Sequence, residues 1–434
     1  TEEMITRLGR LQPQRLGVIA RASAMTFKKS NKDIARIGGA LGAAYILEGG
    51  VRREADRLRI TARLIQASDQ THLWAGDYDR HVHDALTVQS EVAESIAQSL
   101  AVKLLSGPQP APAQAHIPSP ESYDAYLRGC YLRNKWTRED LGKAVGYFEQ
   151  AVEKDPNFAL AYAALAEAWR YLQFFGGARP QDARAKAKEA ALKAVALDEA
   201  LAEARAALAS TRFWYDWDWQ EAEQEFKRAL ALNPSLASAH HDYGWLLIAR
   251  ERFDEGLAEV KRAQELDPLS PQANIDVGWA CIRARRYDEA IAQSRRTMEL
   301  EPNFAETWGC LMRAYQYKGM LAEALAEAQR IMTRSGASPE ELAAIHQGDA
   351  ASGMRNVEQW MLNRMKKAAS RGYVSAYQRA TRHAALGEKE LAFEWLKKAY
   401  TDHDPMMALL NTDPAYDRLR PEPRFGDFLR LIAR

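Results

Sequence analysis

The sequence predicts a mostly α-helical protein, an α-solenoid of repeated helix pairs preceded by a small α/β domain. Three observations support this fold class. Prolines recur every 34 residues at the ends of helical stretches, at Pro234, Pro268 and Pro302. Small residues recur at matched positions within the same period. Between residues 58 and 64, by contrast, apolar and polar residues alternate with the period of two that marks a half-buried strand.

A helix–turn–helix unit of 34 residues is the tetratricopeptide repeat, or TPR. Its two antiparallel helices cross closely and need small residues at the crossing points and where one repeat meets the next. Six repeats are expected, at 122–158, 159–201, 202–236, 237–270, 271–304 and 305–338, with longer turns inside the first two. The small residues that support them are Ala209, Gly244 and Gly278 at the eighth position, Ala144, Ala222 and Ala290 at the twentieth, and Ala151, Ala194, Ala229 and Ala263 at the twenty-seventh.

Composition and charge narrow the functional class. The 434 residues include 59 Lys and Arg against 58 Asp and Glu, a net charge of +1. A protein that binds nucleic acid or an anionic membrane over its whole surface would carry a clear basic excess. The three cysteines are far apart in sequence, which argues against a disulfide framework and fits a reducing compartment. No apolar run approaches the roughly 18 residues of a membrane span. We therefore expect a cytoplasmic protein.

The first hundred residues show a different pattern from the repeats. An amphipathic stretch over 2–11 is followed by a short strand at 16–20. Asn31, Lys32 and Asp33 can cap a helix that runs to Leu41, with Gly42 as its C-cap. Strands are expected at 44–51, 58–67 and 72–78, and a long helix at 85–105. This domain opens on a helix without the strand that would start a β-α-β pattern, so we expect it to be incomplete at its amino terminus.

The remaining boundaries follow from proline content. Five prolines between residues 107 and 120 indicate a semi-stiff linker. The expected organisation is therefore an α/β domain over 1–106, a linker over 107–120, six repeats over 121–338, and a divergent repeat with a helical cap over 339–434. The two helices of the divergent repeat are expected to be joined by a turn at Gly387. A solenoid needs a terminal cap over its last stacking face, which we assign to the proline-punctuated segment after Asp413 and to a helix over Phe425–Ile432.

Several stretches of this sequence resemble a large bacterial family. Residues 47–53, 58–65 and 71–80 resemble the FlgO/TolB-amino-terminal-like domain, which precedes TPR arrays in bacterial signalling proteins. The stretch 215–226 and the tail after Tyr373 resemble the same family, so the resemblance covers nearly the whole chain. It implies an upstream output domain, namely a winged helix of the CadC type, a class III adenylate cyclase or a serine/threonine kinase. No residue here matches the functional motifs of those output domains.

The candidate chemical motifs are weak. The glycines of 38–42 end a helix and precede a strand, the wrong order for a phosphate-binding loop. His81 and His83 lack the spacing and the further ligands of a metal site, and a solvated loop explains them better. No catalytic signature of a hydrolase, kinase or metalloprotease occurs. We therefore expect no catalytic residue, no metal and no cofactor.

The concave face of the solenoid is the expected binding surface. The first helix of each TPR lines this face at positions 2, 5, 9, 12 and 13, and aromatic and arginine residues there are the types that dominate binding hot spots. They suit a peptide with apolar anchors and a carboxylate for the arginines. We expect Trp245 and Trp279 to be exposed in the free protein. The candidate partner-binding residues are Phe213, Trp214, His241, Trp245, Trp279, Arg283, Arg313 and Tyr317.

Two functional interpretations follow. The first is a non-catalytic interaction region that binds a protein or peptide and regulates an attached output domain, without direct nucleic-acid or membrane binding. The second is part of a signalling enzyme, a cyclase or a kinase, whose catalytic domain lies upstream of this chain. An alternative for the concave aromatics also stays open: the protein's own superhelix, an insertion or self-association could cover them.

Overall fold

The structure, a computed structural model, describes most of the chain. It covers residues 17–81 except Lys29, Asn31 and Asp56, residues 118–432 except Arg371, and the isolated positions Ile5, Leu8, Ser95 and His116. The helices expected over 2–11 and 85–105 and most of the expected linker lie outside these residues.

Three antiparallel strands form a sheet in the order β1–β2–β3, with β1 at Tyr45–Glu54, β2 at Arg57–Gln66 and β3 at His72–His81. The alternation predicted for residues 58–64 is confirmed. Leu58, Ala62 and Leu64 are buried, whereas Arg59 and Arg63 are exposed. One face of the sheet therefore contributes to a small apolar core and the other meets solvent.

Helix α3 (Ile34–Leu41) precedes the sheet with the predicted boundaries. The Asp33 carboxylate caps its first turn, and Gly42 ends it with a left-handed φ of 62°. This confirms Gly42 as a C-cap, since glycine adopts that conformation without a steric penalty. The first hairpin is tighter than expected, because Glu54 already pairs with Arg57 across the turn.

A segment before the sheet lies against the solenoid. The backbone N–H of Ala20 donates to the carbonyl of Leu266 at 2.7 Å. Helix α2 (Arg21–Met25) follows, and within it the Ser23 hydroxyl donates to the Asp267 carboxylate at 2.5 Å. Both acceptors belong to the turn between two repeats, so the N-terminal region is attached to the middle of the solenoid.

The strand predicted over residues 16–20 is wrong in its described part, since residues 17–20 form no strand. A strand needs a neighbouring strand to pair its backbone groups. Here the backbone at Ala20 is paired with a solenoid turn, a contact that local hydrophobicity does not reveal.

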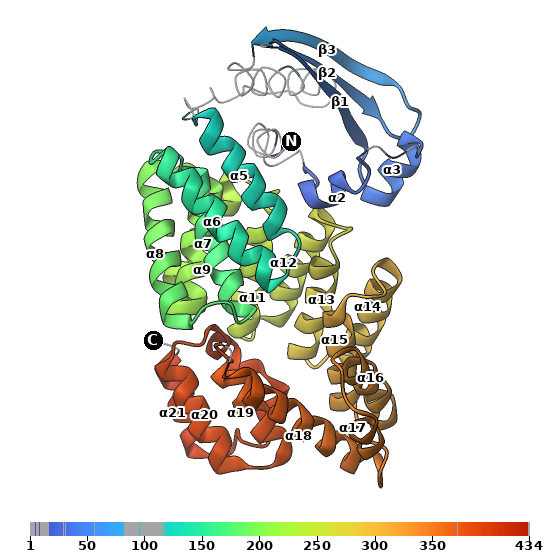
Figure 1. Cartoon of the computed structure of the whole chain (residues 1–434), viewed down its shortest axis with the longest axis vertical. Coiled ribbons are helices and arrows are strands. Elements are labelled where there is room, and N and C mark those ends of the chain that lie inside the picture. Colours follow the sequence, from blue (N-terminus) through green and yellow to red (C-terminus); the bar gives the residue numbers. More distant parts are fainter. Residues whose placement is uncertain are drawn as a thin grey trace.

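Six helix pairs follow, in the six ranges expected for the repeats (Figure 1). Their order is α5 (Pro120–Arg133) and α6 (Arg138–Lys154), α7 (Ala159–Phe174) and α8 (Pro180–Leu197), α9 (Ala202–Thr211) and α10 (Trp219–Leu232), α11 (Ala237–Ala249) and α12 (Phe253–Leu266), α13 (Pro271–Arg283) and α14 (Tyr287–Leu300), and α15 (Ala305–Lys318) and α16 (Leu321–Arg334). A π-helical turn, η2 (Arg212–Asp216), extends α9.

The small residues lie where the helices cross. A Cβ atom added at Gly244 would lie 2.6 Å from Val260 Cγ2 and 2.9 Å from the carbonyl oxygen of Gly256. The alanines predicted at the crossing and stacking positions are all buried. Close helix approach explains why the sequence needs these residue types.

The C-terminal part adds α17 (Pro339–Ala344), α18 (Ala350–Ala368), α19 (Ala376–Leu386), α20 (Lys389–Thr401), the 3-10 turns η3 (Pro405–Thr412) and η4 (Pro414–Tyr416), and α21 (Pro423–Ile432). Helices α19 and α20 form the pair expected for a divergent repeat, and Gly387 ends α19 with a φ of 80°. The expected final helix is present as α21.

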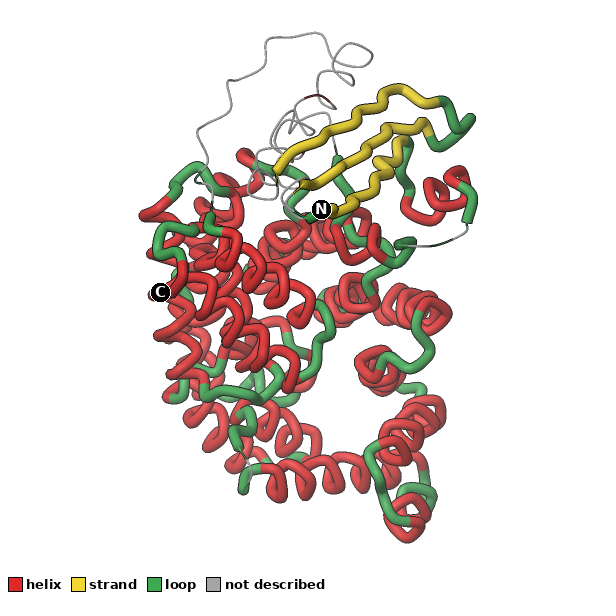
Figure 2. Tube along the Cα trace, turned by 45° about the horizontal axis from the view of Figure 1, so that its top comes forward, coloured by secondary structure: helices red, strands yellow, loops and turns green. Residues whose placement is uncertain are grey.

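The chain curls back on itself after the sixth repeat. Helices α18 to α21 return from α16 towards α8 and α9, and the sheet lies at the opposite end of the molecule (Figures 1 and 2). The Gln181 side chain, at the start of α8, donates to the carbonyl of Thr401 at 3.5 Å. The last helices therefore contact the early repeats as well as covering the last one. Within the described residues, no helix has the length and apolar character needed to cross a bilayer.

Candidate functional site

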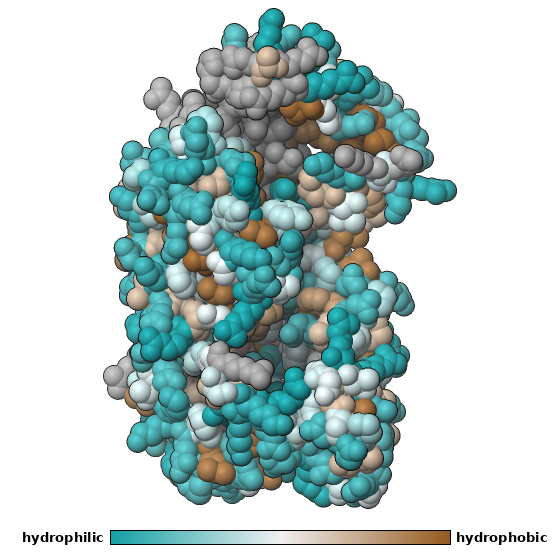
Figure 3. All heavy atoms as spheres, viewed as in Figure 1, coloured by the Kyte–Doolittle hydropathy of each residue, from teal (hydrophilic) through white to brown (hydrophobic). Residues whose placement is uncertain are grey.

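A central cavity of about 540 Å³ lies inside the curled solenoid. Its walls come mainly from the first helices of the repeats, including α7, α11, α13 and α15. Residues 20–22 of the N-terminal segment line one part of it, and Leu409 and Asp413 of the C-terminal segment line another. The face seen in Figure 3 is hollowed between the early repeats and the later ones. The concave surface of this solenoid is thus bounded by both ends of the chain.

Seven of the eight predicted binding residues line this cavity. They are Trp214, His241, Trp245, Trp279, Arg283, Arg313 and Tyr317. Tyr171, Trp136 and Phe175 extend the aromatic lining towards the first two repeats, where the Trp136 and Tyr171 rings meet edge to face with centroids 4.6 Å apart. The repeat positions read from the sequence therefore lead to one shared surface.

Phe213 is the exception. Its side chain is fully buried in the core between helices, and its ring centroid lies 4.5 Å from that of Trp214. Consecutive residues on a helix point about 100° apart, so Phe213 and Trp214 cannot both face the cavity. The assignment of Phe213 to the concave face is corrected accordingly: it is a core residue.

The prediction that Trp245 is exposed in the free protein is also wrong. Trp245 is 7% exposed, as is Trp214, and both belong to the main hydrophobic core. Trp279 is partly buried and packs against the same core. The curl of the chain is the reason, since the cavity walls surround side chains that an open groove would leave in water.

Four charged groups alternate in sign along the cavity: Arg170, Asp242, His241 and Asp276. Arg170 Nη2 lies 3.0 Å from Asp242 Oδ2. His241 bridges the two carboxylates, with Nδ1 3.0 Å from Asp242 Oδ1 and Nε2 3.0 Å from Asp276 Oδ2. The chain of contacts links the second, fourth and fifth repeats.

Burial alone would lower the pKa of His241, but Asp276 and Asp242 outweigh it and raise that pKa to about 10. The ring is therefore protonated at neutral pH and donates one N–H to each carboxylate. Burial likewise raises the pKa of Asp242, while Arg170 and His241 outweigh it and hold that pKa well below its usual range. Trp245 Nε1 lies 3.0 Å from His241 Nε2, but a doubly protonated ring cannot accept its hydrogen bond.

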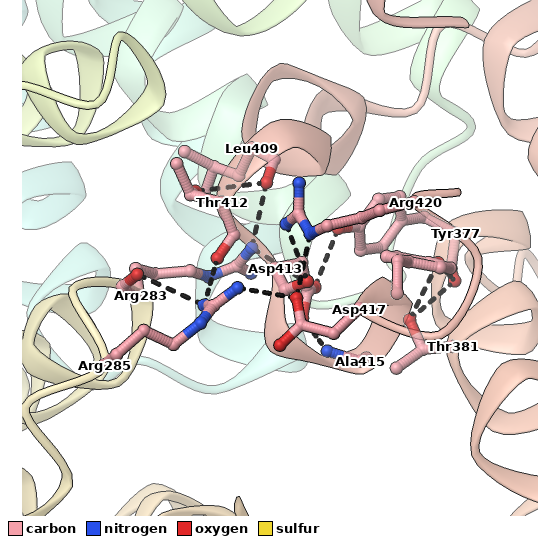
Figure 4. A network of polar contacts seen from close by, with 11 residues as sticks. Arg283, Arg285, Tyr377, Thr381, Leu409, Thr412, Asp413, Ala415, Asp417 and Arg420 are labelled. Carbon is pink, nitrogen blue, oxygen red and sulfur yellow. Dashed lines mark hydrogen bonds and ion pairs between the residues drawn. The ribbon is translucent and has the colours of Figure 1, made fainter. Parts of the chain in front are cut away.

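The C-terminal segment occupies the cavity wall at Arg283 (Figure 4). Arg283 Nη1 donates to the Leu409 carbonyl at 3.0 Å and lies 3.2 Å from Asp413 Oδ2. The Tyr377 hydroxyl donates to the same carboxylate at 2.7 Å. Arg285, two residues after Arg283 in the turn that follows α13, reinforces the contact by donating to the carbonyl of Thr412 at 2.8 Å.

Arg313 is neutralised in a similar way. Its guanidinium forms a two-point ion pair with Glu358 of α18, and Arg382 Nη1 lies 2.9 Å from the same carboxylate. Arg313 and Glu358 are 6% and 2% exposed at their side chains. At Arg283 and Arg313 the carboxylates expected from a partner are supplied by the protein's own chain.

The cavity lining also contains polar residues that were not selected from the sequence, among them Gln272, Asp276 and Glu306. Gln272 and Glu306 hold position 2 of their repeats, one of the concave positions, so the repeat register was sufficient to find them. They were passed over because only aromatic and arginine side chains were considered. Asp276 gave no such signal, because it holds the sixth position of its repeat, next to the concave fifth position. Only the structure shows its contact with His241.

Neither the described cysteines nor the described side chains able to bind a metal form a reactive site. Cys130, Cys281 and Cys310 are buried and form no disulfide. Burial, with a smaller effect of Glu289, raises the pKa of Cys281 to about 11, which keeps this thiol protonated at neutral pH. Among the described residues, no three His, Cys, Asp or Glu side chains are grouped as a metal site requires.

Comparison with known sequences supports the assignment of tetratricopeptide repeats. The Tetratricopeptide repeat family matches residues 211–271 and 241–297. These ranges run from the third repeat into the fifth. The helix pairs and the family match together define the solenoid of this chain as one built from tetratricopeptide repeats.

Two bacterial relatives match part of the chain. A protein of Rhizobium meliloti (strain 1021) that bears the name adenylate cyclase 3 is 36% identical over 166 residues, which are 38% of this chain and 28% of that protein. The transcriptional regulator HilA of Salmonella typhimurium is 32% identical over 143 residues, 33% of this chain and 26% of HilA. The chain thus spans little more than a quarter of the length of these relatives.

Solved TPR structures also resemble it. YrrB, described as a TPR protein with an unusual peptide-binding site, is 22% identical with a TM-score of 0.30, over 43% of this chain and 91% of YrrB. PilW, a type IV pilus biogenesis factor, is 18% identical with a TM-score of 0.40, over 53% of this chain and all of PilW.

Proposed function

We propose that this chain is the non-catalytic, partner-binding region of a bacterial signalling protein, and that it takes a peptide segment of a partner protein into the central cavity. The observation that carries the proposal is the cavity itself, with about 540 Å³ of space behind a wall of tryptophans and tyrosines. This volume falls within the roughly 300–1,000 Å³ typical of ligand sites. Aromatic side chains at such a site supply large contact area at little cost in conformational entropy.

The C-terminal segment at one wall of the cavity limits the length of a peptide that can bind there. An extended peptide that followed the whole concave face would collide with the C-terminal segment at Arg283 and Leu409. A short segment of a few residues, or one protruding side chain with its flanking backbone, fits the available space. The ligand is therefore expected to be a loop or a chain end of the partner.

The arginines of the cavity suit binding better than catalysis. Arg170, Arg283 and Arg313 are each compensated by a carboxylate of the chain. Groups that neutralise one another in this way hold a wall in position and do not supply a free base or nucleophile. The region is also proposed to be cytoplasmic and to bind neither nucleic acid nor membrane directly, in line with its balanced charge.

A regulatory role is supported by the names of the relatives, one a cyclase and the other a transcriptional regulator. The second candidate function, part of a signalling enzyme with an upstream catalytic domain, has the same support. Sequencing the coding region upstream of Thr1 distinguishes the two. A cyclase or kinase domain there establishes the enzyme, and a winged helix establishes the regulator.

A larger side chain placed inside the cavity tests whether the peptide binds there. Ala273 lines the cavity on α13 and is partly exposed there, so Ala273→Trp adds volume without removing a side-chain contact. The matched control is Ala322→Trp, at an exposed position on α16. A displayed library of random hexapeptides is selected on each immobilised full chain. We expect enrichment on the wild type and on Ala322→Trp, and its loss on Ala273→Trp, with similar melting curves for all three.

Equal enrichment on Ala273→Trp would show that the peptides bind elsewhere. No enrichment on the wild type would contradict peptide binding altogether. The non-catalytic assignment is tested separately with the same pure chain. Magnesium-dependent ATP turnover well above a buffer control would overturn it.

A further inference from the structure

One corner of the central cavity presents hydrogen-bond acceptors in excess of donors. The acceptors belong to Gln272, Asp276 and Glu306, which we call the acceptor patch. Gln272 Nε2 donates to Asp276 Oδ1 at 2.9 Å. The Gln272 amide oxygen is left buried and has no hydrogen-bond partner among the described residues. A buried acceptor without a donor is costly, which makes this corner complementary to a group that only donates.

Glu306 adds an uncompensated charge to the patch. Within the part of the chain that the structure describes, its carboxylate has neither a hydrogen-bond partner nor an ion-pair partner. The side chain lines the cavity and remains exposed there, where a ligand can reach it. Partial desolvation by the protein around it raises the pKa of the Glu306 carboxyl, and the nearby charge of Asp276 raises it further. The two carboxylates repel one another, and a cation near them would relieve that repulsion.

The charge of this corner is negative even with the histidine included. The protonated His241 compensates one carboxylate, and its second N–H is used on Asp242. The carboxylate of Glu306 then remains as the unbalanced charge. Five of the arginines that line the cavity are already paired with other carboxylates. Arg170, Arg283 and Arg313 are held by Asp242, Asp413 and Glu358, and Arg133 and Arg382 pair with Glu167 and Glu358.

Tryptophan faces border the acceptor patch. On α13, Trp279 follows Asp276 by three residues, so the two side chains share a helix face. On α15, a Cβ atom built at Gly309 would lie 3.9 Å from Trp279 Cζ2, and Glu306 precedes Gly309 by one helical turn. Trp279, Asp276 and Glu306 all line the cavity, and the ring of Trp279 reaches the helix that carries Glu306. Tryptophan faces attract cations electrostatically, and indole binds them better than the other aromatic rings do.

We propose that the acceptor patch binds the cationic side chain of a lysine or arginine in the partner's peptide segment. This inference rests on the proposed function and specifies the chemistry of its ligand. An ammonium carries three donors and no acceptor, and a guanidinium carries five donors and no acceptor. Either group satisfies Gln272 and Glu306 together, and its aliphatic stem packs along Trp279. The ligand is thus basic, and not the carboxylate-bearing peptide that the cavity arginines suggested in the sequence.

The test uses the full chain and a displayed library of random hexapeptides, with Glu306→Gln as the variant. Glu306 has no polar partner in the described structure, so this change is expected to leave the melting curve unaltered. Glu323→Gln is the matched control, at an exposed glutamate on α16. We expect lysine and arginine to be enriched at one library position on the wild type and on Glu323→Gln, and not on Glu306→Gln.

A second measurement isolates the charge. A selected peptide is compared with its lysine→norleucine analogue, which keeps the stem and lacks the ammonium. We expect norleucine to weaken binding to the wild type about tenfold or more, and to Glu306→Gln by less than about threefold. Selected peptides without a basic residue, equal binding of the norleucine analogue, or basic selection that Glu306→Gln leaves unchanged would each overturn the inference while leaving peptide binding intact. Failure to enrich any peptide would overturn the proposed function itself.

Discussion

The Arg283 guanidinium and the Asp413 carboxylate form a buried ion pair, with Nη1 3.2 Å from Oδ2 and both side chains 9% exposed. The pair joins the fifth repeat to the segment that follows the last helix pair. Through it, the terminal part of the chain holds the curl of the solenoid and forms one wall of the central cavity. The pair thereby connects the stability of the fold with the shape of the central cavity.

Removing one partner of this pair is expected to destabilise the protein strongly. Asp413→Ala leaves the Arg283 charge buried without compensation, which typically costs about 3–5 kcal/mol. The control is Asp427→Ala, which removes an exposed ion pair with Arg430 on α21 and should change the free energy of unfolding by about 0.5 kcal/mol or less. Urea denaturation followed by circular dichroism measures both. Equal effects of the two changes would show that the curl does not depend on Asp413.

Two helical glycines should respond to alanine in opposite directions. Gly244→Ala places a Cβ 2.6 Å from Val260 Cγ2 and should destabilise the protein by about 1–3 kcal/mol through overpacking. Gly146, inside α6, has nothing within 4 Å of an added Cβ. Gly146→Ala should therefore stabilise by about 0.5–1 kcal/mol, because alanine has the higher helix propensity. Thermal melts of both variants test this, and a stable Gly244→Ala would disprove the close crossing at this repeat. A Cβ added at Gly278 would lie 3.0 Å from Cys310 Sγ. The effect of Gly278→Ala on stability should therefore lie between those of Gly244→Ala and Gly146→Ala.

Trp245 is expected to behave as a core residue. Trp245→Ala should lower the free energy of unfolding by about 3–5 kcal/mol, since a large buried side chain leaves a cavity. The control is Tyr131→Ala, which removes an aromatic side chain that is 58% exposed and should have little effect. If Trp245→Ala melted like the wild type, the buried placement of this side chain would be incorrect, and the open concave groove expected from the sequence would apply.

The His241 ion pairs predict a pH dependence of stability with a defined sign. The pKa is about 6.5 in the unfolded chain and about 10 in the fold. The stabilisation is therefore fully present below pH 6.5 and is lost as pH rises towards 10. The difference in unfolding free energy between the wild type and His241→Gln should be on the order of a few kcal/mol at pH 6 and should shrink steadily up to pH 10. A difference that stayed constant or grew over this range would contradict the assignment.

The proline-rich residues 107–120 should be the first site of proteolysis. Prolines and small residues between two packed regions are typical of protease-sensitive joints. Limited digestion with a non-specific protease, followed by mass spectrometry, should yield a stable fragment that begins near residue 120. First cuts within 237–304 would contradict the repeat assignment, because that range forms four adjoining helices and their turns in the core of the solenoid.

Much of the solenoid and part of the site could be predicted because their signals are local. Four of the six repeats carry a proline near their end, at Pro156, Pro234, Pro268 and Pro302. Small residues and apolar spacing also recur within the repeats, and the neighbouring repeat buries the exposed face of each. The positions of Trp214, Trp279 and Tyr317 on the cavity wall followed from that register alone. Asp33 and Gly42 likewise marked the ends of α3 through the chemistry of their own backbone neighbours.

Local sequence patterns thus specified the helix pairs, their order and the face on which the candidate binding residues lie. The tertiary structure alone decided that this face closes into a cavity, that Phe213 and Trp245 are buried, and that Arg283 and Arg313 are neutralised from within. The physical reason is that curvature accumulates from a small rotation at every repeat. It brings together residues such as Arg283 and Asp413, or His241 and Asp276, whose contact no short-range pattern encodes.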